Sequence, residues 1–161
     1  MANITQKITP FLWFDKEAED AANFYTSVFK NASVDSKAYY GEGSPGPAGS
    51  VMTVAFTLEG QKFTALNGGP LFKFTEAVSF VVNCSSQEEV DYYWSKLLED
   101  GAESQCGWLK DKYGLSWQIV PTRLMELLQD KDAGVRNRVM QAMMQMKKIE
   151  VPVLEKAATE K

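Results

Sequence analysis

Apolar residues in the first half of the chain change from a strand-like to a helix-like spacing and back again. Residues 7–14 are rich in β-forming side chains and predict a strand. Residues 16–29 predict a helix, because apolar side chains recur at helical spacing at Ala18, Ala21, Ala22, Tyr25, Val28 and Phe29. We expect Asp15 to cap this helix. Further strands are predicted near residues 33–40, 50–58 and 61–66.

The second half repeats this order of elements after a shift of 69 positions, which carries Phe24 onto Tyr93. Residues 77–84 predict a strand. Ser86 is the expected cap of a helix reaching Leu98, with Glu89 at the capping-box position and Gly101 ending the helix. Strands are predicted near residues 103–107, 108–112 and 115–120. Each half therefore predicts strand–helix–strand–strand–strand.

From Thr122 onwards the pattern no longer follows the repeat. Residues 123–129 and 133–147 predict two helices, the second capped by Asp132. Its apolar stripe comprises Val135, Val139, Ala142, Met143 and Met146. We therefore expect an α+β fold in a single domain, 1–161, built from two βαβββ modules and C-terminal helices. Module one covers 1–70, module two 71–121 and the C-terminal helical extension 122–161.

Composition narrows the range of partners. A net charge of −4 and a pI near 5.0 do not favour a nucleic-acid partner, and all three arginines lie after residue 122. No run of 18 apolar residues could span a bilayer, and no secretory signal is visible at the N-terminus. We therefore expect a cytoplasmic protein with no membrane partner, in which Cys84 and Cys106 are free thiols.

Histidine is absent from all 161 residues, and this limits the chemistry. It is the only side chain that titrates near neutral pH without perturbation, and it is the commonest metal ligand. Ser–His and Cys–His nucleophile pairs and the usual transition-metal sites are therefore excluded.

Six segments of the chain resemble the glyoxalase/bleomycin-resistance/dioxygenase superfamily, also called vicinal oxygen chelate proteins. The likeness is closest to the PhnB-like branch, often described as demethylubiquinone methyltransferase. The segments are residues 8–14, 22–29, 63–70, 87–91, 106–118 and 139–149. The resemblance implies modules whose sheets curl into a half-barrel, and a homodimer. It also implies metal ligands near Ile8, Phe63, Ala77 and Gln118.

None of these four positions provides a strong metal donor, so we expect no metal and no other cofactor. Side chains alternate between the faces of a strand, so residues of the same parity would also line the concave face. The candidates for a ligand cavity are Ile8, Leu12, Phe63, Ala65, Asn67, Ala77, Ser79, Ser116 and Gln118. The opposite parity, which includes Phe11, Trp117 and Ile119, would pack under the helices. The alternative is a half-barrel filled by its own side chains.

Other motifs are open to a structural or a functional interpretation. The spacing Gly41-x-Gly43-x-x-Gly46 matches a dinucleotide fingerprint but precedes a predicted strand, so we expect a loop, with a lid role as an alternative. The run 67–70, Asn-Gly-Gly-Pro, is either a turn or a place where a ligand approaches the backbone. Cys106 is expected to be structural. The methionines near residue 143 favour core packing or a dimer contact.

The sequence favours a metal-free small-molecule-binding protein, and the resemblance implies that it forms a homodimer. No catalytic residue is identified. The alternative is a metal-independent enzyme, either an isomerase or lyase or the methyltransferase that the family description implies. A third hypothesis is a dimer that binds other proteins and whose cavity is vestigial.

Overall fold

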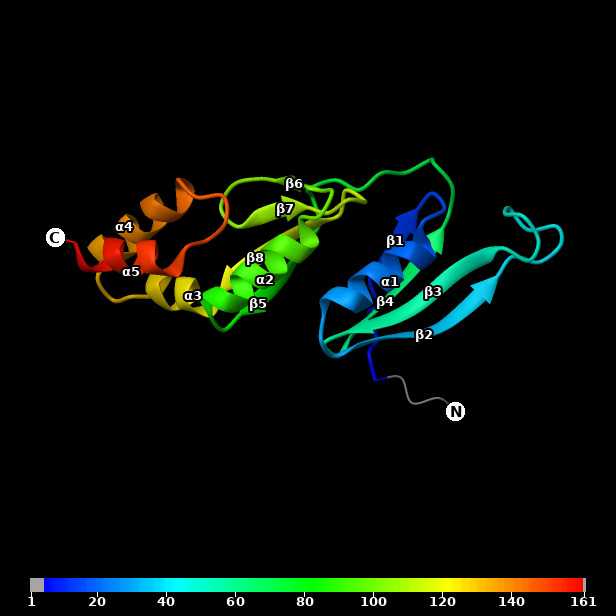
Figure 1. Ribbon diagram of the computed structural model, residues 1–161, viewed down its shortest axis with the longest axis horizontal. Helices are drawn as coiled ribbons and strands as arrows, with labels where there is room; N and C mark the ends of the chain where they lie inside the picture. The colour runs from blue at the N-terminus through cyan, green and yellow to red at the C-terminus, as the bar shows by residue number, and fades with distance from the viewer. Residues whose placement is uncertain (1–4, 161) are drawn as a thin grey trace. The chain divides into compact units, whose positions relative to one another are not determined.

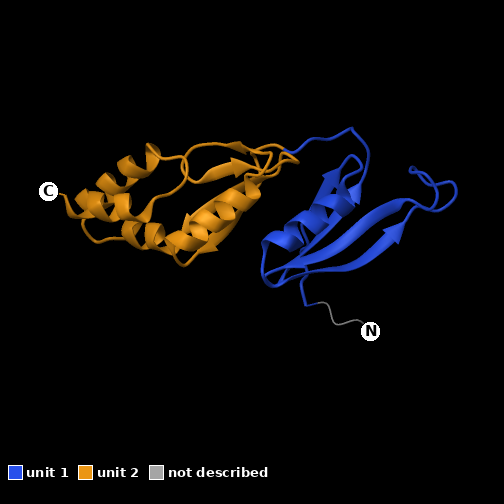
Figure 2. Ribbon diagram, viewed as in Figure 1, with its two compact units in different colours: residues 1–74 blue, residues 75–161 orange. Residues whose placement is uncertain are grey.

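The computed structural model describes residues 5–160, and these fall into two compact units that divide between Phe74 and Thr75 (Figure 2). Each unit contains one strand–helix–strand–strand–strand module, and the second also carries the C-terminal helices (Figure 1). Each module forms its own open four-stranded sheet, with one parallel and two antiparallel strand pairs. The predicted α+β class with two βαβββ modules is confirmed.

The sheet of the first unit has the strand order β1-β4-β3-β2, and helix α1 packs on one face. Strand β1 runs parallel to β4, which places the end of β4 beside the connection from β1 to α1. The elements are β1 (Phe11–Phe14), α1 (Ala18–Val28), β2 (Ala32–Tyr39), β3 (Val51–Leu58) and β4 (Gln61–Asn67).

An aromatic stack forms the centre of this core. Tyr25 of α1 lies over Phe56 of β3, with ring centroids 6.0 Å apart, and Phe56 stacks on Phe63 of β4 at 5.3 Å. All three side chains are buried. Burial of large aromatic surfaces is a major source of folding free energy, so this stack fixes α1 against the sheet.

The sheet of the second unit has the order β5-β8-β7-β6. Its elements are β5 (Ser79–Cys84), α2 (Gln87–Leu97), β6 (Ala102–Glu103), β7 (Trp108–Lys110) and β8 (Ser116–Pro121). Leu109, Trp117 and Ile119 are buried on the side of the sheet that carries α2. Asp111 is also buried, and it accepts hydrogen bonds from the backbone N–H groups of Tyr113 and Leu115 and from the Trp117 indole.

Three helices follow β8: α3 (Thr122–Leu128), α4 (Ala133–Met144) and α5 (Val151–Thr159). The last was not predicted, and α4 ends at Met144 rather than at 147. Val139, Ile149 and Leu154 are fully buried in the core that these helices form with the end of β8. Among residues 5–160, none of the helices has the length and apolar character needed to cross a bilayer.

Two of the three predicted helix caps are confirmed. Ser86 accepts a hydrogen bond from the Glu89 N–H at 3.2 Å, and Asp132 accepts one from the Gly134 N–H at 2.7 Å. The prediction for α1 is wrong, because its N-cap is Glu17 rather than Asp15, and Glu17 makes no capping bond.

Candidate functional site

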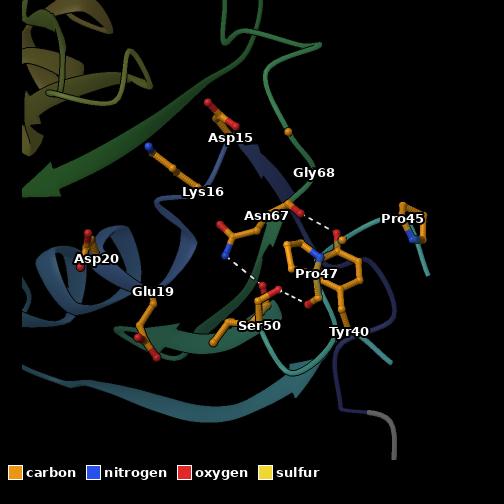
Figure 3. Close-up of a pocket in the computed structure, with 13 residues that line it drawn as sticks. Asp15, Lys16, Glu19, Asp20, Tyr40, Pro45, Pro47, Ser50, Asn67 and Gly68 are labelled. Carbon is orange, nitrogen blue, oxygen red and sulfur yellow. Dashed lines mark hydrogen bonds between the residues drawn. The ribbon is translucent and has the colours of Figure 1, made fainter. Parts of the chain in front are cut away.

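A pocket of about 540 Å³ lies in the first unit, where three segments distant in sequence meet (Figure 3). One segment is the connection from β1 into the first turn of α1. The second is the loop between β2 and β3, and the third is the end of β4 with the two glycines that follow it. The lining residues are Asp15, Lys16, Glu19, Asp20, Tyr40, Pro45, Gly46, Pro47, Ser50, Val51, Asn67, Gly68 and Gly69.

Asn67 connects the three segments through its side chain and its backbone. Its Oδ1 accepts a hydrogen bond from the Ala18 N–H at 2.8 Å, which supplies the acceptor that the N-cap of α1 lacks. Its Nδ2 donates to the Val51 carbonyl at 3.0 Å, and its backbone carbonyl accepts from the Tyr40 hydroxyl at 2.5 Å (Figure 3). This residue therefore fixes the distances between the pocket walls.

The β2–β3 loop forms one wall and is held by its own hydrogen bonds. The Tyr40 N–H donates to the Ser50 carbonyl at 2.9 Å, and the Gly49 N–H donates to the Tyr40 carbonyl at 2.8 Å. Gly46 packs directly on the Tyr40 ring, where a Cβ atom would overlap the ring. The Gly41–Gly46 run is a loop, as predicted, and it leads into strand β3, whereas a dinucleotide-binding turn leads into a helix.

The two glycines after β4 form the turn expected of the Asn-Gly-Gly-Pro run. Gly68 lies against the Trp13 ring with no room for a Cβ, and Gly69 has a φ of +92°, which an L side chain rarely adopts. The Trp13 indole N–H donates to the Gly69 carbonyl at 2.8 Å. The run is therefore a turn that requires glycine, and it also lines the pocket.

Four charged side chains line the pocket, and three of them are acidic. Asp15 and Lys16 come from the connection after β1, and Glu19 and Asp20 from the first turn of α1. Glu19 forms an ion pair with Lys37 of β2, and this hydrogen bond raises the pKa of Lys37. Within the described residues, Asp15, Lys16 and Asp20 form no ion pair.

The five cavity candidates of the first unit have different surroundings. Leu12, Phe63 and Ala65 are buried on the α1 side of the sheet, where Phe63 stacks on Phe56. Asn67 is on the same side and is the one candidate that lines the pocket. Ile8 is 84% exposed. The prediction that these residues face away from the helix is therefore wrong for β1 and β4.

In the second unit, the predicted faces match the structure. Ser79 and Gln118 lie on the side of the sheet opposite α2, and Gln118 Nε2 donates to Ser79 Oγ at 2.9 Å. Ser116 is next to Ser79 in the register and is buried, and its hydroxyl has no hydrogen-bond partner among the described residues. Ala77 precedes β5 and is exposed.

A difference in loop length explains why the faces of the first strand of module one were predicted incorrectly. Phe14 and Cys84 end the first strands of the two modules, 70 positions apart, whereas Ala18 and Gln87 open the helices, 69 positions apart. The first module thus has one more residue between strand and helix. A shift of 69 aligns the helices correctly but slips the strands by one residue, which exchanges their two faces.

The metal that the resemblance implies does not fit the donor atoms of this chain. Ile8, Phe63 and Ala77 have no side-chain donor, and the Gln118 amide is bonded to Ser79. No group of three or more Cys, Asp or Glu side chains within residues 5–160 could hold an ion. The three acids of the pocket therefore do not converge on one point.

Most pocket residues were not among the predicted site residues. The Asn67 turn and the glycine-rich loop were recognised, but Tyr40, Asp15 and Glu19 were not. Their sequence context contains no local motif, since the Tyr40–Asn67 contact joins residues 27 positions apart. Only the tertiary pairing of β4 with β1 and β3 brings them together.

A family model and a solved structure indicate the same protein family for this chain. A family model described as 3-demethylubiquinone-9 3-methyltransferase matches residues 6–120. A PhnB protein from Bacillus cereus, with the same description, is 42% identical with a TM-score of 0.66, over 72% of this chain and 99% of that chain. No curated protein matches the chain.

Two further structures share the fold at lower identity. Protein PA1353 from Pseudomonas aeruginosa is 19% identical with a TM-score of 0.61, over 73% of this chain and 98% of that chain. The fosfomycin resistance protein FosX from Listeria monocytogenes is 17% identical with a TM-score of 0.57, over 79% and 99%. Another FosX crystal holds Mn(II) and sulfate.

Proposed function

This chain belongs to the 3-demethylubiquinone-9 3-methyltransferase family, the PhnB-like branch of the glyoxalase superfamily, and from that premise we propose that it binds a small molecule without a metal ion. The proposed site is the pocket of the first unit. The observation that carries the proposal is the set of hydrogen bonds through which Asn67 joins the walls of a cavity of about 540 Å³. Ligand sites are commonly preformed cavities of this size with a few fixed polar groups.

The metal-free part of the proposal rests on the donor atoms. FosX crystallises with Mn(II), but the positions to which the resemblance assigns the metal ligands hold Ile8, Phe63, Ala77 and Gln118, and Phe63 lies in the core on the α1 side of the sheet. We expect titration of the full chain with MnCl₂, followed by calorimetry, to give no stoichiometric binding. One Mn²⁺ bound per chain, weakened by Gln118→Ala, would overturn this part.

Methyl transfer, which the family description names, receives no support from the pocket. S-adenosylmethionine sites commonly place a glycine-rich turn before a helix, whereas the glycine-rich loop here leads into β3. We expect no binding of S-adenosylmethionine by calorimetry. Saturable binding that is lost when the pocket is filled would favour the enzyme over the binding protein.

A pair of serine variants tests the pocket itself. Ser50→Phe places a ring in the cavity, and Ser36→Phe places the same ring on exposed β2, outside the pocket. Ligand-observed NMR with a mixed fragment library identifies the compounds that bind the full chain. The wild type and Ser36→Phe should bind the same fragments, and Ser50→Phe should bind few of them. Equal binding by both variants would exclude the pocket as the site.

We also propose a cytoplasmic homodimer, as the resemblance implies, organised as one domain with two modules and a helical extension. Light scattering during size-exclusion chromatography should give about twice the chain mass of 18.0 kDa. A monomer at micromolar concentration would contradict the dimer.

A further inference from the structure

The polar groups of the pocket differ in how many hydrogen bonds they already make. The chemical class of ligand that we infer below from these groups rests on the proposed function of the same pocket. The donors are largely used within the protein: the Tyr40 hydroxyl bonds to the Asn67 carbonyl, and the Ser50 hydroxyl bonds to the Pro47 carbonyl at 2.6 Å. The N–H groups of Gly68 and Gly69 donate to the carbonyls of Phe14 and Asp15, at 2.8 and 3.1 Å.

The groups that remain available are mainly acceptors. A carboxylate accepts hydrogen bonds and donates none, and the carboxylates of Asp15 and Asp20 have no partner within the described residues. Glu19 is already paired with Lys37. Lys16 is the one cation of the lining, and it is exposed. A ligand that offers only acceptors would therefore find few partners here, and an anion would also be repelled.

The spacing of the acids argues against a metal ion as the ligand. Asp15, Glu19 and Asp20 line one pocket but do not form a group that could coordinate an ion together. Each carboxylate can nevertheless accept hydrogen bonds from an ammonium or amidinium group on its own. The remaining wall is apolar, with Pro45, Pro47 and Val51.

We propose that the pocket selects organic cations, namely a primary ammonium or amidinium group on a small apolar body. The cationic group would lie against the carboxylate of Asp15 or Asp20, and the apolar body would lie along the prolines and Val51. The cationic group supplies the hydrogen-bond donors and the positive charge that the carboxylates can accept, and the apolar body matches the apolar wall.

Three probes of similar size test this selectivity: 2-phenylethylamine, 2-phenylethanol and phenylacetate. Each is titrated into the ¹⁵N-labelled full chain at low salt, and amide shifts of Asn67, Gly68 and Gly69 report binding in the pocket. Partly exposed ion pairs contribute modestly, so we expect the amine to bind about 3–10-fold more tightly than the alcohol. The anion should bind most weakly, and added salt should reduce the preference.

Charge-matched variants connect the preference to the carboxylates. Asp15→Asn/Asp20→Asn should bind the amine and the alcohol equally. Glu99→Gln/Glu160→Gln changes the net charge by the same amount in the second unit and should keep the preference. If the alcohol or phenylacetate binds as tightly as the amine, the selectivity is wrong while the pocket remains a binding site. If no probe shifts the pocket amides, both the selectivity and the proposed site are wrong.

Discussion

Asn67 gives the sharpest test at the scale of single residues, because its side chain uses an acceptor and a donor in two different contacts. Asn67→Asp keeps an oxygen for the Ala18 N–H but turns a second oxygen towards the Val51 carbonyl, where Nδ2 donates now. Loss of a partly buried hydrogen bond and repulsion between two oxygens should lower the free energy of unfolding by about 1–3 kcal/mol.

Chemical denaturation measures this loss, and Asn83→Asp, at an exposed position of β5, is the matched control. The position of Asn67 in the pocket makes a second prediction possible. Fragment binding should weaken in Asn67→Asp even under conditions where the variant is fully folded. Wild-type stability together with wild-type binding would mean that Asn67 does not hold the walls.

The two cysteines should differ in reactivity although both are free. Burial raises the pKa of the Cys84 thiol to about 12, with a smaller contribution from the nearby Glu89 carboxylate. Its thiol donates to the Val82 carbonyl at 3.6 Å. Iodoacetamide at pH 8 should therefore alkylate the half-buried Cys106 first, because the thiolate is the nucleophile.

Peptide mass spectrometry identifies the modified residue, and equal alkylation rates of the two cysteines in denaturant provide the control.

The raised pKa of Cys84 also predicts a pH dependence of stability. Cys84 keeps its proton in the folded chain and loses it near pH 9 when unfolded, so stability should fall from about pH 9 to about 12. Equal alkylation of both thiols in the folded chain would contradict the burial of Cys84.

At the scale of elements, the helix caps show which local rules the sequence carries. Ser86 and Asp132 could be predicted because a capping side chain bonds to a backbone N–H two or three residues later. The acceptor for the Ala18 N–H is Asn67, 49 positions away, and no local pattern indicates it. Asp15 is of a residue type that is favoured at N-caps, but the N-cap position of α1 is occupied by Glu17.

This difference predicts unequal costs for two alanine substitutions. Ser86→Ala removes the bond to the Glu89 N–H and should cost about 1 kcal/mol of stability. Asp15→Ala removes no capping bond and should stay within about 0.5 kcal/mol of wild type. Urea unfolding of both variants makes the comparison. A larger loss for Asp15→Ala than for Ser86→Ala would restore Asp15 as a cap.

The order of elements was predictable, whereas the faces of β1 and β4 were not. Strand β1 is apolar on both faces, so alternation alone does not say whether Leu12 meets the helix. The answer depends on the single extra residue between β1 and α1. In β4, Phe63 and Ala65 alternate with polar residues, but the face was assigned from the resemblance instead. In β8 the contrast between Trp117 and Gln118 made the assignment clear.

At the scale of the whole unit, the C-terminal helices are part of the hydrophobic core of the second unit. The sequence predicted a helical extension outside the repeat, but these helices share a core with the second unit. The N–H groups of Cys106 and Gly107 donate to the carbonyls of Met146 and Lys147, and Gln87 bonds to both the Ile149 carbonyl and the Val151 N–H. The start of α5 is therefore fixed by contacts more than 60 positions away in sequence, which local spacing does not reveal.

Ile149 lies where these contacts converge, since it is fully buried and packs against Gly107. Ile149→Ala leaves a cavity between the helices and the second sheet, and it should cost about 2–5 kcal/mol of unfolding free energy. Val153→Ala removes a half-exposed side chain two residues into α5 and should change stability by less than about 0.5 kcal/mol. Hydrogen exchange localises the effect: in Ile149→Ala, amides of α4, α5 and β8 should lose protection, while those of β3 and β4 in the first unit should keep it. Protection lost only in α5 would mean that the extension is an independent appendage, as the repeat pattern alone suggested.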